Sequence, residues 1–221
     1  MVHPFILPDA VRGKSIVWLD TPWCQHDPRC LERGPADGWP RYTNPVEVQA
    51  LGSFLRSLRR ENTSEEIELA ILSPYNQQVA LMNRQLSEAY IRGGGLILKE
   101  HRRTRPGVAD ETDERRVAHS VDSFQGNQAD VIAVSLVRNN ALLPGQGMGF
   151  LDDAPRLNVL LSRAERLLIL VGSWEFYWRQ VSLVELADVH HPLWHWRKVM
   201  DTLGGWFVEQ RAHRVKAEVQ S

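Results

Sequence analysis

Short apolar runs recur along the chain and are separated by amphipathic stretches. Six of these runs are apolar almost throughout instead of alternating with polar residues, which is typical of parallel strands covered on both faces. They lie at Ser15–Leu19, Ile67–Leu72, Leu96–Lys99, Ala118–Val121, Val131–Leu136 and Leu167–Val171. The pattern predicts an α/β fold with an open, mostly parallel sheet and helices on both of its faces.

Proline-containing starts mark two of the expected helices. Residues 44–47 (Asn-Pro-Val-Glu) offer an N-cap, a proline at the first helical position and a glutamate that can complete a capping box. Residues 73–74 (Ser-Pro) repeat the cap and the proline. A third helix, capped by Asp152 or Asp153, is expected before the last of the six strands.

Three segments lack this periodicity: a long loop at 21–43, a charged and mobile stretch at 100–116, and a glycine-containing loop at 140–149. From residue 173 onward aromatic side chains become frequent, and we expect them to pack a helical extension onto the sheet rather than to stack on bases. The expected units are an N-terminal segment with the first strand and the long loop at 1–43, a core at 44–175, and a helical, aromatic-rich extension at 176–221.

Composition is typical of a soluble globular protein, with 43% hydrophobic and 24% charged residues. No apolar run approaches the roughly 18 residues that span a bilayer, and the first residues lack the features of a signal peptide. Two cysteines cannot form a disulfide framework, so we expect a cytoplasmic protein without a membrane partner. The net charge of −1 does not indicate a polyanionic partner, although basic clusters at 99–105 and 211–216 either contact phosphates or remain solvated.

We do not expect the chain to hold a nucleotide by itself. Residues 13–15 (Gly-Lys-Ser) match the end of a P-loop, but Pro8 stands where that motif needs its first glycine. The following residues continue as a strand, whereas a P-loop enters a helix whose N–H groups bind phosphate. Asp20 ends this strand as a magnesium-holding aspartate would, but no P-loop precedes it.

A metal site is not expected either. Cys24, His26 and Cys30 fit no standard zinc spacing and lack a fourth ligand, so metal binding by them is only an alternative. His191 and His195 can share a helical face, but the catalytic glutamate of a metalloprotease is missing between them.

Two segments carry groups that suit ligand binding. Residues 120–130 form a polar, glycine-containing turn that leads into a buried strand, a place where α/β proteins bind ligands. Further on, Arg156 and Arg163 are seven residues apart and therefore lie along one line of the expected helix. The pair can meet a phosphate group or can form surface salt bridges, and the residues alone leave both interpretations open.

Several segments taken together resemble motifs IV, V and VI of superfamily 1 helicases, and especially the Upf-like enzymes. They are residues 73–78 (Ser-Pro-Tyr-Asn-Gln-Gln), 121–126 (Val-Asp-Ser-Phe-Gln-Gly), 137–140 (Val-Arg-Asn-Asn), 149–151 (Gly-Phe-Leu) and 156–164 (Arg-Leu-Asn-Val-Leu-Leu-Ser-Arg-Ala). The resemblance covers roughly residues 44–175 and implies a RecA-like domain. In that family two such domains sandwich ATP, and the first supplies the P-loop and the magnesium-holding acids.

The resemblance implies a role for each matching residue. Arg163 matches the arginine finger that stabilises the transferring phosphoryl group. The nucleotide is expected to contact Tyr75, Gln78, Gln125, Gly126, Asn127, Gln128 and Arg156. The nucleic acid is expected to contact Ser73, Ser120, Asp122, Ser123 and Arg138. Two departures weaken the match, because many relatives have Arg-Glu where this chain has Asn127 and Gln128, and an arginine where it has Pro155.

The function that follows is ATP-driven movement on, or unwinding of, single-stranded DNA or RNA, with this chain as the second half of the motor. ATP and Mg²⁺ would be held mainly by a first RecA-like domain, which is the expected protein partner. The alternative is a non-catalytic nucleic-acid-binding or interaction module that retains the fold. A P-loop domain encoded directly upstream would favour the motor.

Overall fold

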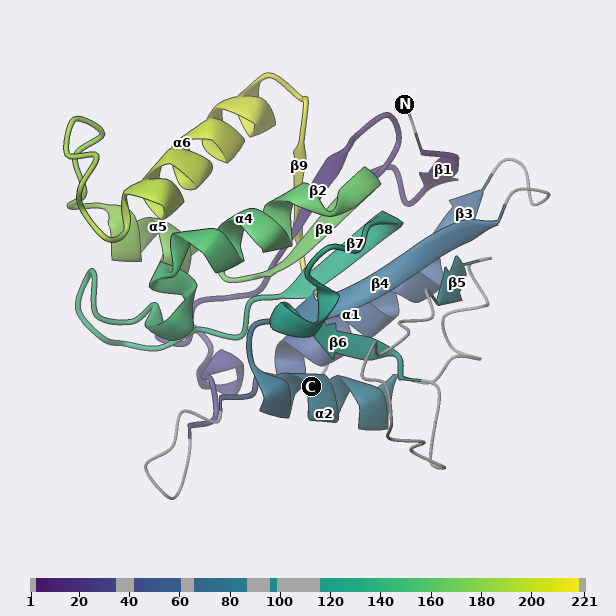
Figure 1. The fold of residues 1–221 in the computed structure, drawn as a ribbon, viewed down its shortest axis with the longest axis horizontal. Coiled ribbons are helices and arrows are strands. Elements are labelled where there is room, and N and C mark those ends of the chain that lie inside the picture. The colour runs from purple at the N-terminus through teal and green to yellow at the C-terminus, as the bar shows by residue number, and fades with distance from the viewer. Residues whose placement is uncertain (1–2, 35–41, 61–65, 87–95, 99–115, 219–221) are drawn as a thin grey trace.

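A computed structural model describes residues 3–34, 42–60, 66–86, 96–98 and 116–218, and its centre is a seven-stranded sheet (Figure 1). The strand order is β5–β4–β7–β8–β2–β9, and β6 pairs with β4 beyond the end of β5. Every pair in this sheet is parallel. The strands are β2 (Ile16–Asp20), β4 (Ile67–Ser73), β5 (Leu96–Leu98), β6 (Ala118–Ser120), β7 (Ala129–Ser135), β8 (Ala164–Gly172) and β9 (His213–Lys216).

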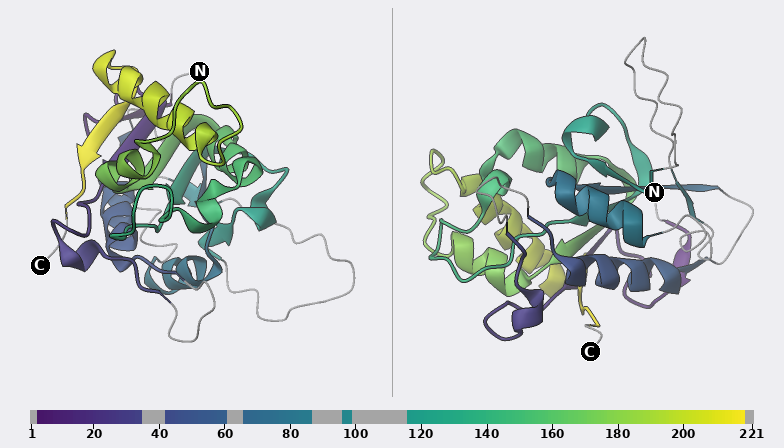
Figure 2. Two further views of the ribbon diagram at one scale, coloured as in Figure 1. Left: turned by 90° about the vertical axis from the view of Figure 1, so that its left-hand side faces the viewer. Right: turned by 90° about the horizontal axis from the view of Figure 1, so that it is seen from below.

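Helices cover both faces of the sheet, as the sequence predicts. On one side lie α1 (Pro45–Ser57) and α2 (Asn76–Gln85), and on the other lie α4 (Ala154–Ser162), α5 (Trp174–Val181) and α6 (Trp194–Val208) (Figure 2). Three short 3-10 turns complete the described helical structure: η1 (Pro28–Cys30), η2 (Asp122–Phe124) and η3 (Gly149–Asp152). In the part of the chain that is described, no helix is long and apolar enough to cross a membrane.

The strands alternate their side chains between two hydrophobic cores. In β2, Val17 and Leu19 belong to the core under α1 and α2, whereas Trp18 belongs to the core under α4, α5 and α6. Because both faces are covered, both sets of side chains must be apolar. This confirms the six predicted strands and explains why their sequences do not alternate, although Lys99, the last residue of one prediction, lies outside the described residues.

Three described strands were not predicted. β1 (Phe5–Leu7) and β3 (Arg59–Arg60) form a separate antiparallel pair, and β9 returns from α6 to pair with β2. β9 is short, polar and largely exposed, so it lacks the continuous apolar run by which the other strands were recognised. The region after residue 173 is therefore helical first and then adds an edge strand.

The predicted helix starts need correction in detail. Asn44 caps α1 by accepting a hydrogen bond from the Glu47 N–H (3.3 Å), but Glu47 turns into the core and does not complete a capping box. α2 begins at Asn76 rather than after Ser73, and its N-cap residue Tyr75 makes no side-chain cap. Asp153 is the N-cap residue of α4, again without a side-chain hydrogen bond.

Aromatic packing joins α5 and α6 to the sheet. The rings of Trp196 and Tyr177 are stacked with centroids 5.1 Å apart, and Trp18 of β2 meets Tyr177 edge-on at 5.9 Å. Trp196 and Tyr177 are buried, as expected for core residues. The division of the chain at residues 43 and 175 stays a prediction.

Candidate nucleotide and nucleic-acid site

The turn between β6 and β7 exposes polar side chains. Gln125 and Gln128 are exposed and Asn127 is partly so, while Phe124 anchors the turn in the core. Gly126 has a φ of 85°, a conformation that strains residues with a side chain. The sequence therefore predicted this turn correctly as a local structure, and its contacts with a nucleotide stay a prediction.

Arg163 lies next to this turn. It is the C-cap residue of α4, and its carbonyl oxygen accepts a hydrogen bond from the N–H of Ala129, the first residue of β7 (3.2 Å). The Nε atom of Arg163 is shielded from solvent and has no hydrogen-bond partner among the described residues. An unpaired buried donor costs about 1–3 kcal/mol, so an acceptor brought by a ligand would stabilise this arrangement.

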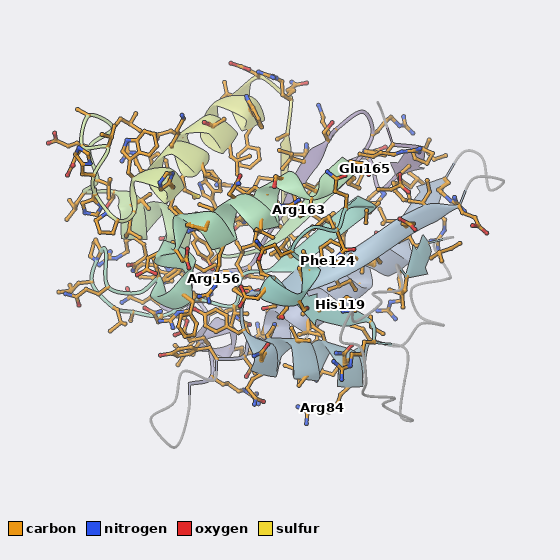
Figure 3. The ribbon with its side chains drawn as sticks, in the orientation of Figure 1. Arg84, His119, Phe124, Arg156, Arg163 and Glu165 are labelled. Carbon is orange, nitrogen blue, oxygen red and sulfur yellow. The ribbon has the colours of Figure 1, made fainter. Side chains whose placement is uncertain are left out.

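Arg156 lies toward the other end of α4 (Figure 3). Its Nε is 3.2 Å from Asp122 and 3.7 Å from Asp153, and its guanidinium lies 5.4 Å from the centre of the Phe150 ring. The ion pair with Asp122 joins α4 to the η2 turn. Arg156 is expected to contact the nucleotide and Asp122 the nucleic acid, so the pair connects the two predicted contact surfaces. Both partners are exposed enough that the pair itself contributes little stability.

Ser120 and Ser123 hold the start of that turn. The Ser123 hydroxyl donates to the Ser120 carbonyl (2.9 Å), and the Ser120 hydroxyl accepts from the Ser123 N–H (3.2 Å). Both side chains are partly exposed, beside the exposed Asp122. They are available for a ligand, and their contact with nucleic acid stays a prediction.

Four other predicted contacts lie inside the protein. Ser73 is fully buried, and its hydroxyl accepts from the Tyr75 N–H (3.3 Å). Gln78 is also fully buried, bonded to both backbone groups of Asn44 and to the Ser135 hydroxyl. Neither side chain has exposed surface for a ligand in this structure.

Arg138 and Tyr75 form a second buried group. Arg138 is 3% exposed, makes an ion pair with Glu32 (3.1 Å) and lies 3.9 Å from the centre of the Tyr42 ring. Tyr75 is 2% exposed and packs against the rings of Tyr42 and Phe150, and burial raises the pKa of its hydroxyl to about 12. Burial also raises the pKa of Glu32, although the Arg138 charge acts in the opposite direction.

Sequence reasoning missed the acidic side chains that support this group. Glu32 lies in the segment expected to be a long loop, and Glu47 was interpreted as a capping residue. Glu47 has no exposed surface; its Oε2 accepts from the Ser135 hydroxyl (2.6 Å) and the Val137 N–H (2.8 Å). The signal for Glu47 was present but ambiguous, since a glutamate three residues after an N-cap fits both roles.

The remaining sequence candidates have other partners. Cys24 and Cys30 are buried thiols, and burial raises the pKa of Cys30 to about 11, which disfavours the thiolate that binds metal. His26 contacts Glu175 at 3.0 Å. No group of three or more His, Cys, Asp or Glu side chains among the described residues could hold a metal ion. The Lys14 side chain, which lies just before β2, donates a hydrogen bond to the carbonyl oxygen of Gln210.

Comparison with known proteins identifies the family. A family model described as "AAA domain" matches residues 9–175, most of the chain. Proteins named as helicases are among its relatives. The chain belongs to this AAA-domain family of Upf1-like superfamily 1 helicases. Its parallel sheet, covered on both faces, is the RecA-like fold expected from the motifs.

Curated relatives of this Upf1-like domain are much longer proteins. The chain is 32% identical over 158 residues to DNA polymerase alpha-associated DNA helicase A of Saccharomyces cerevisiae, covering 67% of this chain and 20% of that protein. It is 30% identical over 162 residues to ATP-dependent helicase upf1 of Schizosaccharomyces pombe, covering 70% and 15%. The match to a Regulator of nonsense transcripts 1 homolog of Drosophila melanogaster is shorter, 52% over 54 residues, covering 24% and 4%. The chain thus spans a fifth or less of each.

Proposed function

We propose that this chain is the second motor domain of an ATP-dependent helicase that acts on single-stranded DNA or RNA. The placement of Arg163 carries the proposal. It stands at the end of α4 beside the exposed turn 125–128, with an Nε that no described residue satisfies. A guanidinium in this position can neutralise charge on a phosphoryl group that another domain presents.

The residues present fit part of ATP. The cation of Arg163 suits the phosphates. The exposed amides of Gln125 and Gln128 and the partly exposed amide of Asn127 suit the polar groups of a ribose or phosphate. We assign Mg²⁺ mainly to a first RecA-like domain, as the resemblance to superfamily 1 helicases implies. Bound ATP would supply the phosphoryl group, and this chain would orient it and offset its charge.

By the same reasoning, this chain alone does not turn over ATP. Residues 13–15 run into β2 rather than into a helix, so they offer no row of helical N–H groups to a phosphate. A cytoplasmic location for the motor stays a prediction. The whole protein's substrate and partners also belong to this proposal.

The test is to add a matching P-loop domain and to measure ATP turnover stimulated by single-stranded nucleic acid. Arg163→Ala should lower kcat by about 10³-fold or more, the usual effect of losing an arginine finger. KM for ATP should change much less, because the finger acts mainly on charge in the transition state. The matched control is Arg84→Ala, which removes an exposed arginine from the last turn of α2.

An unchanged kcat in Arg163→Ala would refute the arginine finger. Turnover by the chain alone, abolished by Lys14→Ala, would show that residues 13–15 do bind phosphate. If no P-loop domain restores turnover although the chain still binds nucleic acid, the non-catalytic binding module is the better description.

A further inference from the structure

The backbone bends sharply just after β7. Val137 has a φ of 75°, which is unusual for any residue other than glycine and most unfavourable for a β-branched one. The N–H of Arg138 donates to the carbonyl of Leu136 (2.9 Å), so the chain closes a three-residue γ-turn around Val137. Such a conformation persists only where surrounding groups hold it.

Two side chains from the start of α1 hold both polar backbone groups of Val137. The Val137 N–H donates to Glu47 Oε2 (2.8 Å), and the Val137 carbonyl accepts from Asn44 Nδ2 (3.2 Å). Glu47 and Asn44 are fully buried, so water cannot replace them. We call this arrangement the Val137 clasp, defined by Asn44, Glu47 and Val137.

The bend determines where the next side chain points. Arg138 is directed to Glu32, to the Tyr42 ring and to the backbone at Gly149. A Cβ atom added to Gly149 would lie 3.0 Å from Arg138 Nη1 and 2.8 Å from Tyr75 Oη, so these side chains press directly on the chain there. An extended Val137 would turn the Arg138 side chain elsewhere and remove this support.

From Gly149 the contacts continue to α4. Gly149 begins η3, the next residue Phe150 packs on Tyr75 (5.7 Å between centroids), and Arg156 lies over Phe150 at 5.4 Å. η3 also leads directly into α4, whose C-cap residue is Arg163. The clasp is thus connected to Arg156 through packed side chains, and to Arg163 along α4.

We propose that Glu47 and Asn44 are positioning residues that fix η3 and α4, and through α4 the site of Arg163, by holding Val137 in a strained turn. The claim that these residues fix η3 and α4 does not depend on what the protein does. The consequence for ATP turnover rests on the proposed ATPase function. The mechanism makes a specific claim. The two side chains matter because φ at Val137 is unfavourable, so a glycine at that position should make them largely dispensable.

The first experiment measures hydrogen exchange of single amides in this chain by NMR. The Leu151 N–H, bonded to Met148 O within η3, reports on the segment under test, and the Leu86 N–H, bonded to Met82 O at the end of α2, is the internal control. Glu47→Leu, which keeps bulk but loses the acceptor, should speed exchange at Leu151 relative to Leu86 by about tenfold or more, since exchange follows local opening. Glu47→Gln keeps an acceptor and should stay close to the parent.

The double variant Glu47→Leu with Val137→Gly decides between positioning and general stability. Recovery of most of the Leu151 protection supports the proposal, because glycine adopts a positive φ without strain. Equal acceleration at Leu151 and Leu86 in Glu47→Leu, or no recovery in the double variant, overturns it. If Glu47→Leu does not fold, Asn44→Ser provides the same comparison, since serine still caps α1 but is too short to reach the Val137 carbonyl.

The second experiment tests the consequence for turnover in the assembled motor. Glu47→Leu should lower kcat about tenfold, and Val137→Gly should restore most of it, because misplaced groups chiefly affect the transition state. A kcat that is unaffected while η3 opens would show that the clasp does not act on the site. If the parent motor has no turnover at all, the proposed function fails, and the exchange data still decide the structural part.

Discussion

Glu47 carries a carboxyl group whose chemistry is set by its surroundings. Burial raises its pKa to about 8, although the hydrogen bonds from Ser135 and Val137 favour the ionised form. The titratable groups that interact with it are Glu32, Cys30 and Tyr177. A group of this kind takes up a proton when the protein folds at neutral pH.

The sign of the resulting pH dependence follows directly. The carboxyl is protonated in the folded state below pH about 8, but ionised in the unfolded chain above its ordinary pKa of about 4.5. The free energy of unfolding should therefore fall as pH rises between these two values. Glu47→Gln should flatten that fall, which urea unfolding measures at about pH 5.5 and about pH 7.5, in the lower and upper parts of this window.

The exposed Glu165 of β8 provides the matched control, because Glu165→Gln also removes one carboxyl but no buried one. Equal pH dependence in the parent and in Glu47→Gln would mean that Glu47 is ionised in the folded state.

At the same scale, the sequence could identify candidate residues but not their exposure. The spacing of Arg156 and Arg163 predicted that both lie along one helix, and the structure places Arg156 in α4 and Arg163 directly after it as the C-cap residue. Ser73 and Gln78 have side chains that suit ligands equally well, yet long-range contacts bury them. No local pattern contains that information, because their neighbours in space are far away along the chain.

At the scale of elements, the glycine in the turn between β6 and β7 can be compared with a glycine in a turn elsewhere in the protein. Gly126 and Gly13 both have positive φ, and an added Cβ would meet nothing within 4 Å at either position. An alanine at either should thus cost a similar conformational energy, about 1–2 kcal/mol, measured by urea unfolding. In the assembled motor, however, only Gly126→Ala should also lower ATP turnover, because only that turn lies beside Arg163.

If both variants keep the ATP turnover of the parent, the 125–128 turn does not contact the nucleotide. A loss in both would indicate that lower stability alone reduces activity.

The predictability of each element depended on where its stabilising contacts lie. Parallel strands with an apolar composition can be recognised from the sequence, and all six such runs were found. β9 is placed by its pairing with β2, and its own polar, largely exposed residues give little indication of a strand. At the start of α1 the local sequence predicted that Glu47 completes a capping box. Its side chain is instead buried and accepts a hydrogen bond from the Val137 N–H, a long-range contact that the local pattern does not contain.

For the molecule as a whole, charge sets the expectation for nucleic-acid binding. The net charge of −1 provides no broad positive field, and the hydroxyls of Ser120 and Ser123 carry no charge. We expect weak binding of single strands without sequence preference, and a shallow salt dependence of about 0.7 in log K per phosphate contacted. The basic stretch 99–105, which also motivated this expectation, lies outside the described residues.

Fluorescence anisotropy with labelled strands of several sequences, at low and high salt, measures these properties. Ser123→Ala should weaken binding, whereas Ser182→Ala, at an exposed serine after α5, should not. Tight or sequence-selective binding would favour the stand-alone binding module. Absence of binding at any salt would remove Ser120 and Ser123 from the proposed contact surface.

The pairing of β2 also determines the order in which the molecule can be made. Val17 pairs with Ile169 of β8 on one side and with His213 of β9 on the other, 152 and 196 positions later in the chain. At about 5–20 residues per second, a ribosome needs roughly 10–40 s to make the second partner after β2 has emerged. The first partner, β8, is made after roughly 8–30 s at the same rate, and until then the apolar strand β2 has neither neighbour. The edge of β2 that pairs with β9 stays open for longer, so a nascent chain should depend on chaperones until residue 216 leaves the ribosome.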